Sequence, residues 1–197
     1  VSNFYGPSCW NPRSANTGIW EGRYGLRRPW LRQALRIVQV NEVDTNASWL
    51  IVTTKFYNTS DSMLRGVYYM ATGDPDNDQP WPGGSFPTHN HISYQGGPFD
   101  RHEVNARPPS IHQDAFSGLA TQDCRAKALI YQSWPPSIAS TAGNNLNRVW
   151  AETASGMGGT YYALGHTTFS QDIAFGLVFN VGNIAPHDSA SICFGWI

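Results

Sequence analysis

The stretch IAFGLVFNV, residues 173–181, decides the fold class. Large apolar side chains occupy its odd positions, while Ala174, Gly176 and Asn180 occupy even ones. Side chains two apart on a β-strand point to the same face, so this period of two predicts a strand with an apolar face. The alternation resumes over 190–196, after a turn-rich segment at 183–188, and the two stretches together predict a closing hairpin.

The same period recurs earlier in the chain and predicts strands over 34–43, 48–57, 64–70 and 126–131. Gly, Pro, Asn and Asp gather between these runs, as is typical of turns. No convincing amphipathic helix pattern accompanies them. The sequence therefore predicts an all-β fold, an antiparallel β-sandwich of the Ig-like or jelly-roll-like kind.

Domain organisation is predicted from the segments that lack the two-residue alternation of apolar side chains. Residues 1–33 show no sustained pattern and predict an extended N-terminal arm, followed by one β-sandwich domain over 34–197. The polar segments 73–125 and 137–159 are predicted as long loops, and loops of this length usually carry function. Because the sequence has no initiator Met and stops inside a strand pattern, we expect an excerpt or a processed mature unit.

Composition excludes several classes of partner. The net charge is −1 and 14% of the residues are charged, where about a quarter is usual. No basic run indicates a nucleic-acid partner, and no apolar run reaches the about 18 residues of a membrane span. Aromatic residues reach 13%, which favours a surface covered by neighbouring copies or glycans.

Glycosylation triplets and cysteines point to an extracellular or cell-surface location. Asn46 and Asn58 each begin an Asn-X-Ser triplet and are the predicted N-glycosylation sites. Cys9, Cys124 and Cys193 are the disulfide candidates. One pair with a left-over thiol and three buried thiols both remain open.

The densest acidic feature is GDPDND, residues 73–78. Asp74, Asp76 and Asp78 stand at alternate positions, which brings three carboxylates within reach of one hard cation such as calcium. The rest of the EF-hand pattern fails. The alternative is a turn that ends a strand, since Asp, Pro and Asn form turns in any case.

A second candidate metal set is His89, His91 and Gln95. On a strand the two imidazoles share a face, so both can meet one metal. With Gly83, the spacing resembles the first cupin motif, with Gln95 in place of its Glu. That resemblance implies a β-barrel metalloenzyme, but no second cupin motif follows. No complete catalytic set is found, so no catalytic residue is predicted.

Aromatic residues in the predicted loops are candidate glycan or partner contacts, because sugar faces pack on aromatic rings. Packing on the domain's own core or on a neighbour is the alternative. These residues are Trp81, Tyr94, Phe99 and Trp134.

Two groups of segments carry a family resemblance. The strand 50–57 runs into Asn58-Thr59-Ser60 and is followed by an aromatic strand and by Asp74-Pro75-Asp76; the hairpin 172–196 closes the chain. This combination resembles β-sandwich domains of mastigoneme (flagellar hair) proteins and related surface proteins of algae and other protists. The resemblance spans roughly 34–197. It implies a non-enzymatic, glycosylated building block of an extracellular filament, with Asp74, Pro75 and Asp76 as signature positions.

The leading prediction is a structural subunit or domain of an extracellular filament or adhesive assembly, with copies of itself or related domains as partners. A carbohydrate-binding module that uses calcium is the second hypothesis. A cupin-like metalloenzyme is the third.

Overall fold

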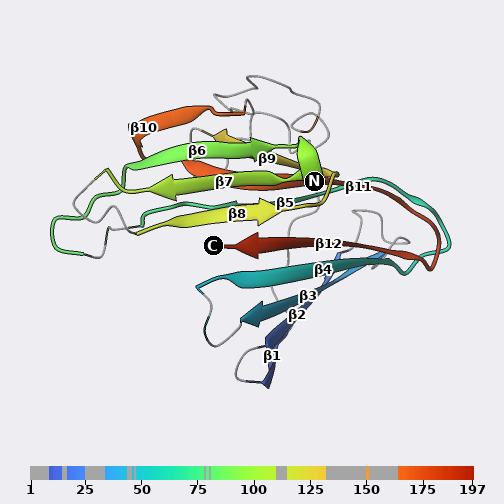
Figure 1. Ribbon diagram of the computed structural model, residues 1–197. Coiled ribbons are helices and arrows are strands. Elements are labelled where there is room, and N and C mark those ends of the chain that lie inside the picture. Colours follow the sequence, from blue (N-terminus) through green and yellow to red (C-terminus); the bar gives the residue numbers. More distant parts are fainter. Residues whose placement is uncertain are drawn as a thin grey trace. The chain divides into compact units, whose positions relative to one another are not determined.

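The computed structural model describes the backbone of residues 9–14 and 17–24 and, with their side chains except that of Pro98, residues 34–43, 46, 48–77, 79, 81–109, 115–131, 150 and 164–197 (Figure 1). Its strands form two antiparallel sheets, which confirms the all-β prediction. One 3₁₀ turn, η2 (Pro98–Asp100), accompanies them. The strands are β1 (Cys9–Ser14), β2 (Thr17–Tyr24), β3 (Leu35–Val43), β4 (Leu50–Asn58), β5 (Leu64–Gly73), β6 (Thr88–Gln95), β7 (His102–Arg107), β8 (Ser117–Thr121), β9 (Ala126–Tyr131), β10 (Thr167–Gln171), β11 (Ala174–Ile184) and β12 (Ser189–Trp196).

The chain divides into two compact units, the first of which holds β1 to β4 and most of β12. Its strands follow the order β1-β2-β3-β4-β12. β2 pairs with β3 from Thr17 opposite Glu42 to Tyr24 opposite Leu35. The predicted extended arm therefore contains two strands. Their side chains gave no alternating signal, but backbone N–H and C=O groups form a ladder whatever side chains they carry.

At the end of β4, Asn58 is only 2% exposed. Its Nδ2 donates to the carbonyl oxygens of Ser62 at 2.7 Å, Ile184 at 3.0 Å and Ala185 at 3.0 Å. Its Oδ1 accepts from the Ser60 backbone N–H at 3.0 Å and from the Ser60 hydroxyl at 2.7 Å. The nitrogen that a glycan would need is enclosed, which argues against glycosylation of Asn58 once the protein has folded. Asn46 is exposed, and its glycosylation stays a prediction.

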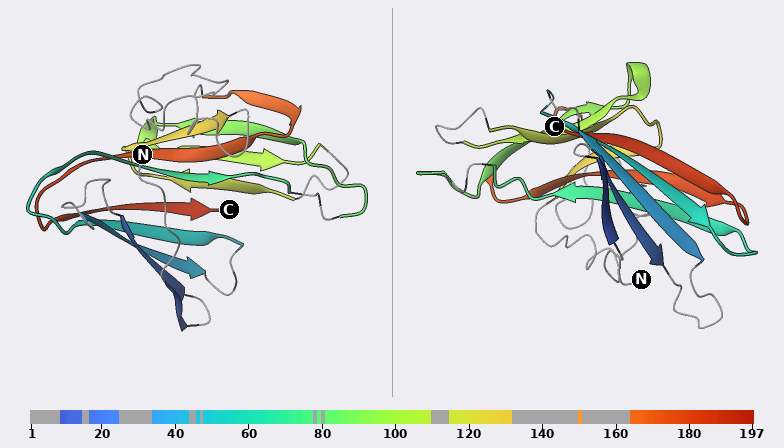
Figure 2. Two further views of the ribbon diagram at one scale, coloured as in Figure 1. Left: turned by 180° about the vertical axis from the view of Figure 1, so that it is seen from behind. Right: turned by 90° about the horizontal axis from the view of Figure 1, so that it is seen from below.

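The second unit is sandwich-like. One sheet runs β8-β7-β6-β10 and the other β5-β11-β9, and β9 lies against β6 and β7 (Figure 2). β11 pairs with β9 from Ala174 opposite Tyr131 to Phe179 opposite Ala126. Apolar side chains from both sheets are fully buried here, among them Ile92, Val104, Leu119, Ile130, Phe175 and Leu177.

β11 is buried on both faces, which its alternating sequence did not indicate. Every residue from 174 to 179 is buried. Ala174 and Val178 form a second apolar cluster with Leu129 and Tyr131, against which Met70 and Trp150 pack. Small residues on this face therefore serve close packing and not exposure to solvent.

Gly176→Ala tests this close packing. A Cβ at residue 176 would lie 2.6 Å from the backbone oxygen of Ala71, which belongs to the neighbouring strand β5. Since a backbone atom in a sheet cannot move aside cheaply, we expect the free energy of unfolding to fall by about 2 kcal/mol in urea denaturation. Gly176→Ser, which is larger, should lose more. An alanine variant as stable as the parent would show that the strands separate freely here.

The predicted loop 73–125 contains three strands, β6, β7 and β8, so this prediction is wrong. The reason lies in the inward face of β6, which carries Thr88, Asn90 and Ile92. Asn90 is buried because its Nδ2 donates to the Thr88 hydroxyl at 2.9 Å. Two polar residues out of three leave no apolar alternation to detect.

Neither Cys124 nor Cys193 forms a disulfide, and both are exposed, which also excludes buried thiols at these two positions. The side chain of Cys9 lies outside the described residues. None of the helical segments among the described residues has the length and apolar character needed to cross a membrane.

Candidate functional site

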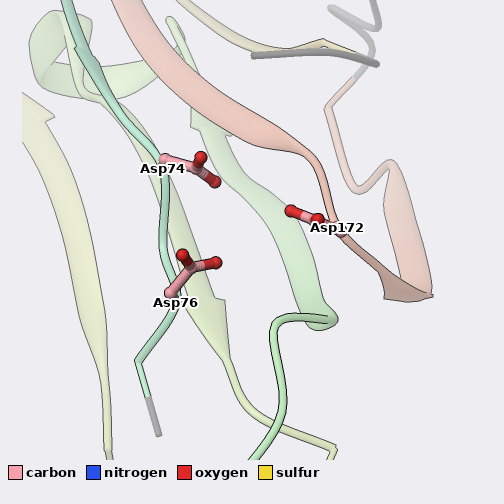
Figure 3. A group of neighbouring side chains, drawn as sticks. All are labelled: Asp74, Asp76 and Asp172. Carbon is pink, nitrogen blue, oxygen red and sulfur yellow. The ribbon is translucent and has the colours of Figure 1, made fainter. Parts of the chain in front are cut away.

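Three carboxylates meet at the end of β5. Asp74 and Asp76 follow this strand, and Asp172 lies between β10 and β11 (Figure 3). One oxygen from each lies within 4.8 Å of the others. The Asp76 N–H donates to the Asp74 carbonyl oxygen at 3.1 Å, so a tight turn around Pro75 holds the two residues close together. The predicted pairing of Asp74 with Asp76 is therefore present, while Asp78 lies outside the described residues.

The acidic cluster is electrostatically strained. The Oδ1 atoms of Asp74 and Asp76 are buried and have no hydrogen-bond partner. Burial, and then the charge of Asp172, raises the pKa of Asp74. Burial, followed by the charges of Asp74 and Asp172, also raises the pKa of Asp76. Like charges at this distance disfavour ionisation of the group, and a cation would relieve them.

One buried hydroxyl in the same unit also lacks a partner. Tyr131, at the end of β9, is fully buried, and its hydroxyl has no hydrogen-bond partner. Burial raises the pKa of Tyr131, and the charge of Asp74 raises it further. A buried polar group without a partner costs free energy. A bound cation would satisfy the unpaired oxygens of Asp74 and Asp76.

The donor set suits a hard cation. Calcium takes six to eight oxygen ligands, and magnesium is also bound by carboxylates and water. Asp74, Asp76 and Asp172 supply carboxylate oxygens from two separate segments. Sequence reasoning missed Asp172, because nothing near this lone acid marks it as the partner of residues so much earlier in the chain.

His89 and His91 share the outer face of β6, as predicted from their spacing, and line one groove of about 380 Å³. The His91 Nδ1 lies 2.6 Å from the Thr167 hydroxyl oxygen. The His89 ring meets the Phe169 ring edge-on, with 5.5 Å between the centroids. The groove is lined by His89, His91, Ser93, Glu103, Asn105, Arg107, Phe116 and Thr167.

Gln95 does not join the two imidazoles. Ile92 pairs with Val104, but Tyr94 pairs with Glu103, so Ser93 is the extra residue of a β-bulge. A bulge reverses the side to which later residues point. The Gln95 amide instead accepts from the Ala128 N–H at 2.8 Å and donates to the Ala128 carbonyl at 2.7 Å. The predicted His-His-Gln metal set is therefore not assembled, and the group of metal-binding side chains found among the described residues contains no histidine.

Glu103, at the floor of the groove, forms an ion pair and a hydrogen bond. Arg101 reaches its Oε2 at 2.5 Å, and the Asn105 Nδ2 lies 3.3 Å from its Oε1. The same Nδ2 donates to the Ser93 hydroxyl at 2.6 Å. The Arg101 guanidinium also lies 3.9 Å from the centre of the Tyr94 ring. This network was missed because the segment was predicted as a loop, although its polar residues stand two apart on each strand.

The predicted aromatic contacts are spread over several loops. Tyr94 and Phe99 lie on the β6–β7 hairpin and Trp81 lies between β5 and β6. All three are exposed, Phe99 most of all at 84%. Trp134 lies outside the described residues.

No family model matches this chain, and no curated protein matches it. The geometry of the cluster and of the groove therefore carries the functional interpretation.

Proposed function

We propose that this chain is a non-enzymatic structural domain of an extracellular or cell-surface assembly, and that calcium bound by Asp74, Asp76 and Asp172 stabilises it. One observation carries the proposal: three carboxylates converge, and two of them, on Asp74 and Asp76, each have a buried oxygen without a hydrogen-bond partner. Such a cluster lowers stability unless a cation joins it. Its value to the protein is then structural, since it ties the segment after β5 to the entry of β11.

The proposed calcium site is consistent with the extracellular part of the proposal. A site of three carboxylates, one of them on the exposed Asp172, is built for weak binding. Extracellular modules bind calcium with dissociation constants of about 10⁻⁴ to 10⁻³ M, which suits the concentrations found outside cells.

Exposed aromatic rings support assembly. Phe99 stands at the tip of the β6–β7 hairpin with φ 70°, and Asp100 beside it has φ 49°. Non-glycine residues held in this left-handed region cost about 1–3 kcal/mol each, and such strain persists mainly at functional positions. A strained turn that presents a ring to solvent is well explained if a neighbouring copy or a related domain covers that ring.

Phe99→Ser is the variant that tests assembly. We expect the full chain in calcium to self-associate as its concentration rises, and the variant to associate about tenfold more weakly because one buried aromatic contact is lost. Sedimentation velocity over a concentration series measures this. Met63→Ser, which removes another exposed apolar side chain, is the control and should leave association unchanged. A parent protein that stays monomeric throughout would sink the assembly proposal.

A further inference from the structure

We propose that the groove on the outer face of β6 and β7 binds an acidic saccharide, a sugar that carries a carboxylate or a sulfate group. The groove measures about 380 Å³, within the range of small-ligand sites. The groove shares no residue with the acidic cluster. The proposal therefore goes beyond the proposed structural function, and its test does not depend on calcium binding.

The sheet builds the groove from alternate residues. His89, His91 and Ser93 point outward from β6, between the buried residues Thr88, Asn90 and Ile92. On β7, Glu103, Asn105 and Arg107 line the same groove. Because residues two apart on a strand share a face, six polar side chains form one continuous floor.

The charge balance of the groove favours an anionic ligand. Arg101 already neutralises Glu103 through the 2.5 Å ion pair. Arg107 is exposed, and its guanidinium lies 5.3 Å from the centre of the Phe116 ring. Within the part of the chain that the structure describes, no carboxylate forms an ion pair with Arg107. A guanidinium braced on an aromatic ring presents paired N–H donors that match a carboxylate or a sulfate.

The backbone of the groove floor favours a sugar over a peptide. β6 lies between β7 and β10, and β7 lies between β6 and β8. Their N–H and C=O groups are thus used within the sheet, so neither β6 nor β7 offers an open edge to an added peptide strand. What the groove offers is hydroxyl, amide and imidazole groups, which both donate and accept as sugar hydroxyls do.

Apolar rings at the edge of the groove fit the same ligand. Phe116 lines it directly, and Phe169, which is 70% exposed, stands edge-on to His89. Sugar rings present flat C–H faces that pack on such aromatic planes.

Polar side chains in the groove are already oriented. The Asn105 amide is held by Ser93 and Glu103, and the His91 Nδ1 is held by the Thr167 hydroxyl. The hydrogen bond at Nδ1 fixes the ring and leaves Nε2 for a ligand. Side chains held in place before binding lose little conformational entropy when the ligand arrives.

Titration calorimetry with matched saccharides tests the groove. The probes are a sulfated tetrasaccharide with its desulfated counterpart, and tetragalacturonate with galactotetraose, each titrated into the full chain in EGTA. We expect the acidic member of at least one pair to bind about tenfold more tightly than the neutral member, because a charge-assisted hydrogen bond is gained. The pair that responds identifies sulfate or carboxylate as the recognised group.

Variants locate the binding. Arg107→Gln should weaken binding of the acidic saccharide about tenfold, and His89→Gln should weaken it by a smaller factor. Arg65→Gln, at another exposed arginine, is the matched control and should bind as the parent does. Three results would overturn the proposal: equal binding of acidic and neutral saccharides, an equal loss in the Arg65 variant, or tighter binding of a hexaglutamate peptide than of any acidic saccharide.

Discussion

Asn58→Asp is expected to lower the free energy of unfolding by about 3–5 kcal/mol, since it replaces the donor of three hydrogen bonds by an acceptor. The new oxygen would face the carbonyl oxygens of Ser62, Ile184 and Ala185, all within 3.0 Å of the present nitrogen. No water can intervene at a side chain so fully enclosed. The buried charge would repel these carbonyl dipoles, which adds to the lost bonds.

Urea denaturation of the variant and of Asn46→Asp measures this effect. Asn46 begins the other Asn-X-Ser triplet and is exposed, so the identical chemical change there should cost less than about 0.5 kcal/mol. Equal losses in the two variants would mean that the Asn58 amide does not organise this turn. Asn58 also shows why a glycosylation triplet is weak evidence: the Asn58 and Ser60 side chains of the triplet form a hydrogen-bonded turn.

The strands that sequence reasoning predicted well are those with an apolar core face. β9 begins and ends at the predicted residues 126 and 131, and β3, β4 and β12 begin within two residues of their predicted starts. β6 was missed because its buried face carries Thr88 and Asn90, whose side chains are hydrogen-bonded to each other. Hydrophobic periodicity cannot report a buried face built from polar side chains.

The candidate sites were predictable only where their residues are neighbours in the chain. Asp74 and Asp76 lie close together because one tight turn around Pro75 contains both, which local sequence reveals. Asp172 reaches them through the pairing of β11 in its sheet, which local sequence does not reveal. Gln95 was placed beside His91 by counting residues, and the bulge at Ser93 reversed that result. One extra residue in the β-ladder is enough to turn a predicted metal ligand, Gln95, away from the histidines and into a structural contact.

In the absence of calcium, Asp172→Asn is expected to be more stable than the parent at neutral pH. The folded-state pKa values of Asp74 and Asp76 are raised, by burial first and then by neighbouring carboxylates. A group with a raised folded-state pKa contributes stability that is fully present below its unfolded pKa of about 3.9 and is lost as the pH rises through the folded value. Removing the Asp172 charge reduces this loss. Because these groups are partly exposed and screened by solvent, we expect a gain of roughly 0.5–1 kcal/mol.

With calcium the order of stability should reverse. A ligand that binds only the folded state stabilises it by about 2.7 kcal/mol at a hundred times its dissociation constant. The parent should gain an increment of this order, while Asp172→Asn, which lacks one carboxylate ligand, should gain much less. Unfolding in urea, measured in EGTA and in calcium, gives both differences. Glu42→Gln removes one negative charge from an exposed position on β3 and should show neither effect. If calcium does not change the stability of the parent, the proposed site is contradicted. If Asp172→Asn is less stable than the parent both in EGTA and in calcium, Asp172 makes a direct bond that the fold requires. The parent must be less stable than Asp172→Asn in EGTA and more stable than it in calcium. Only this reversal identifies a cluster of mutually repelling carboxylates that serves to bind an ion.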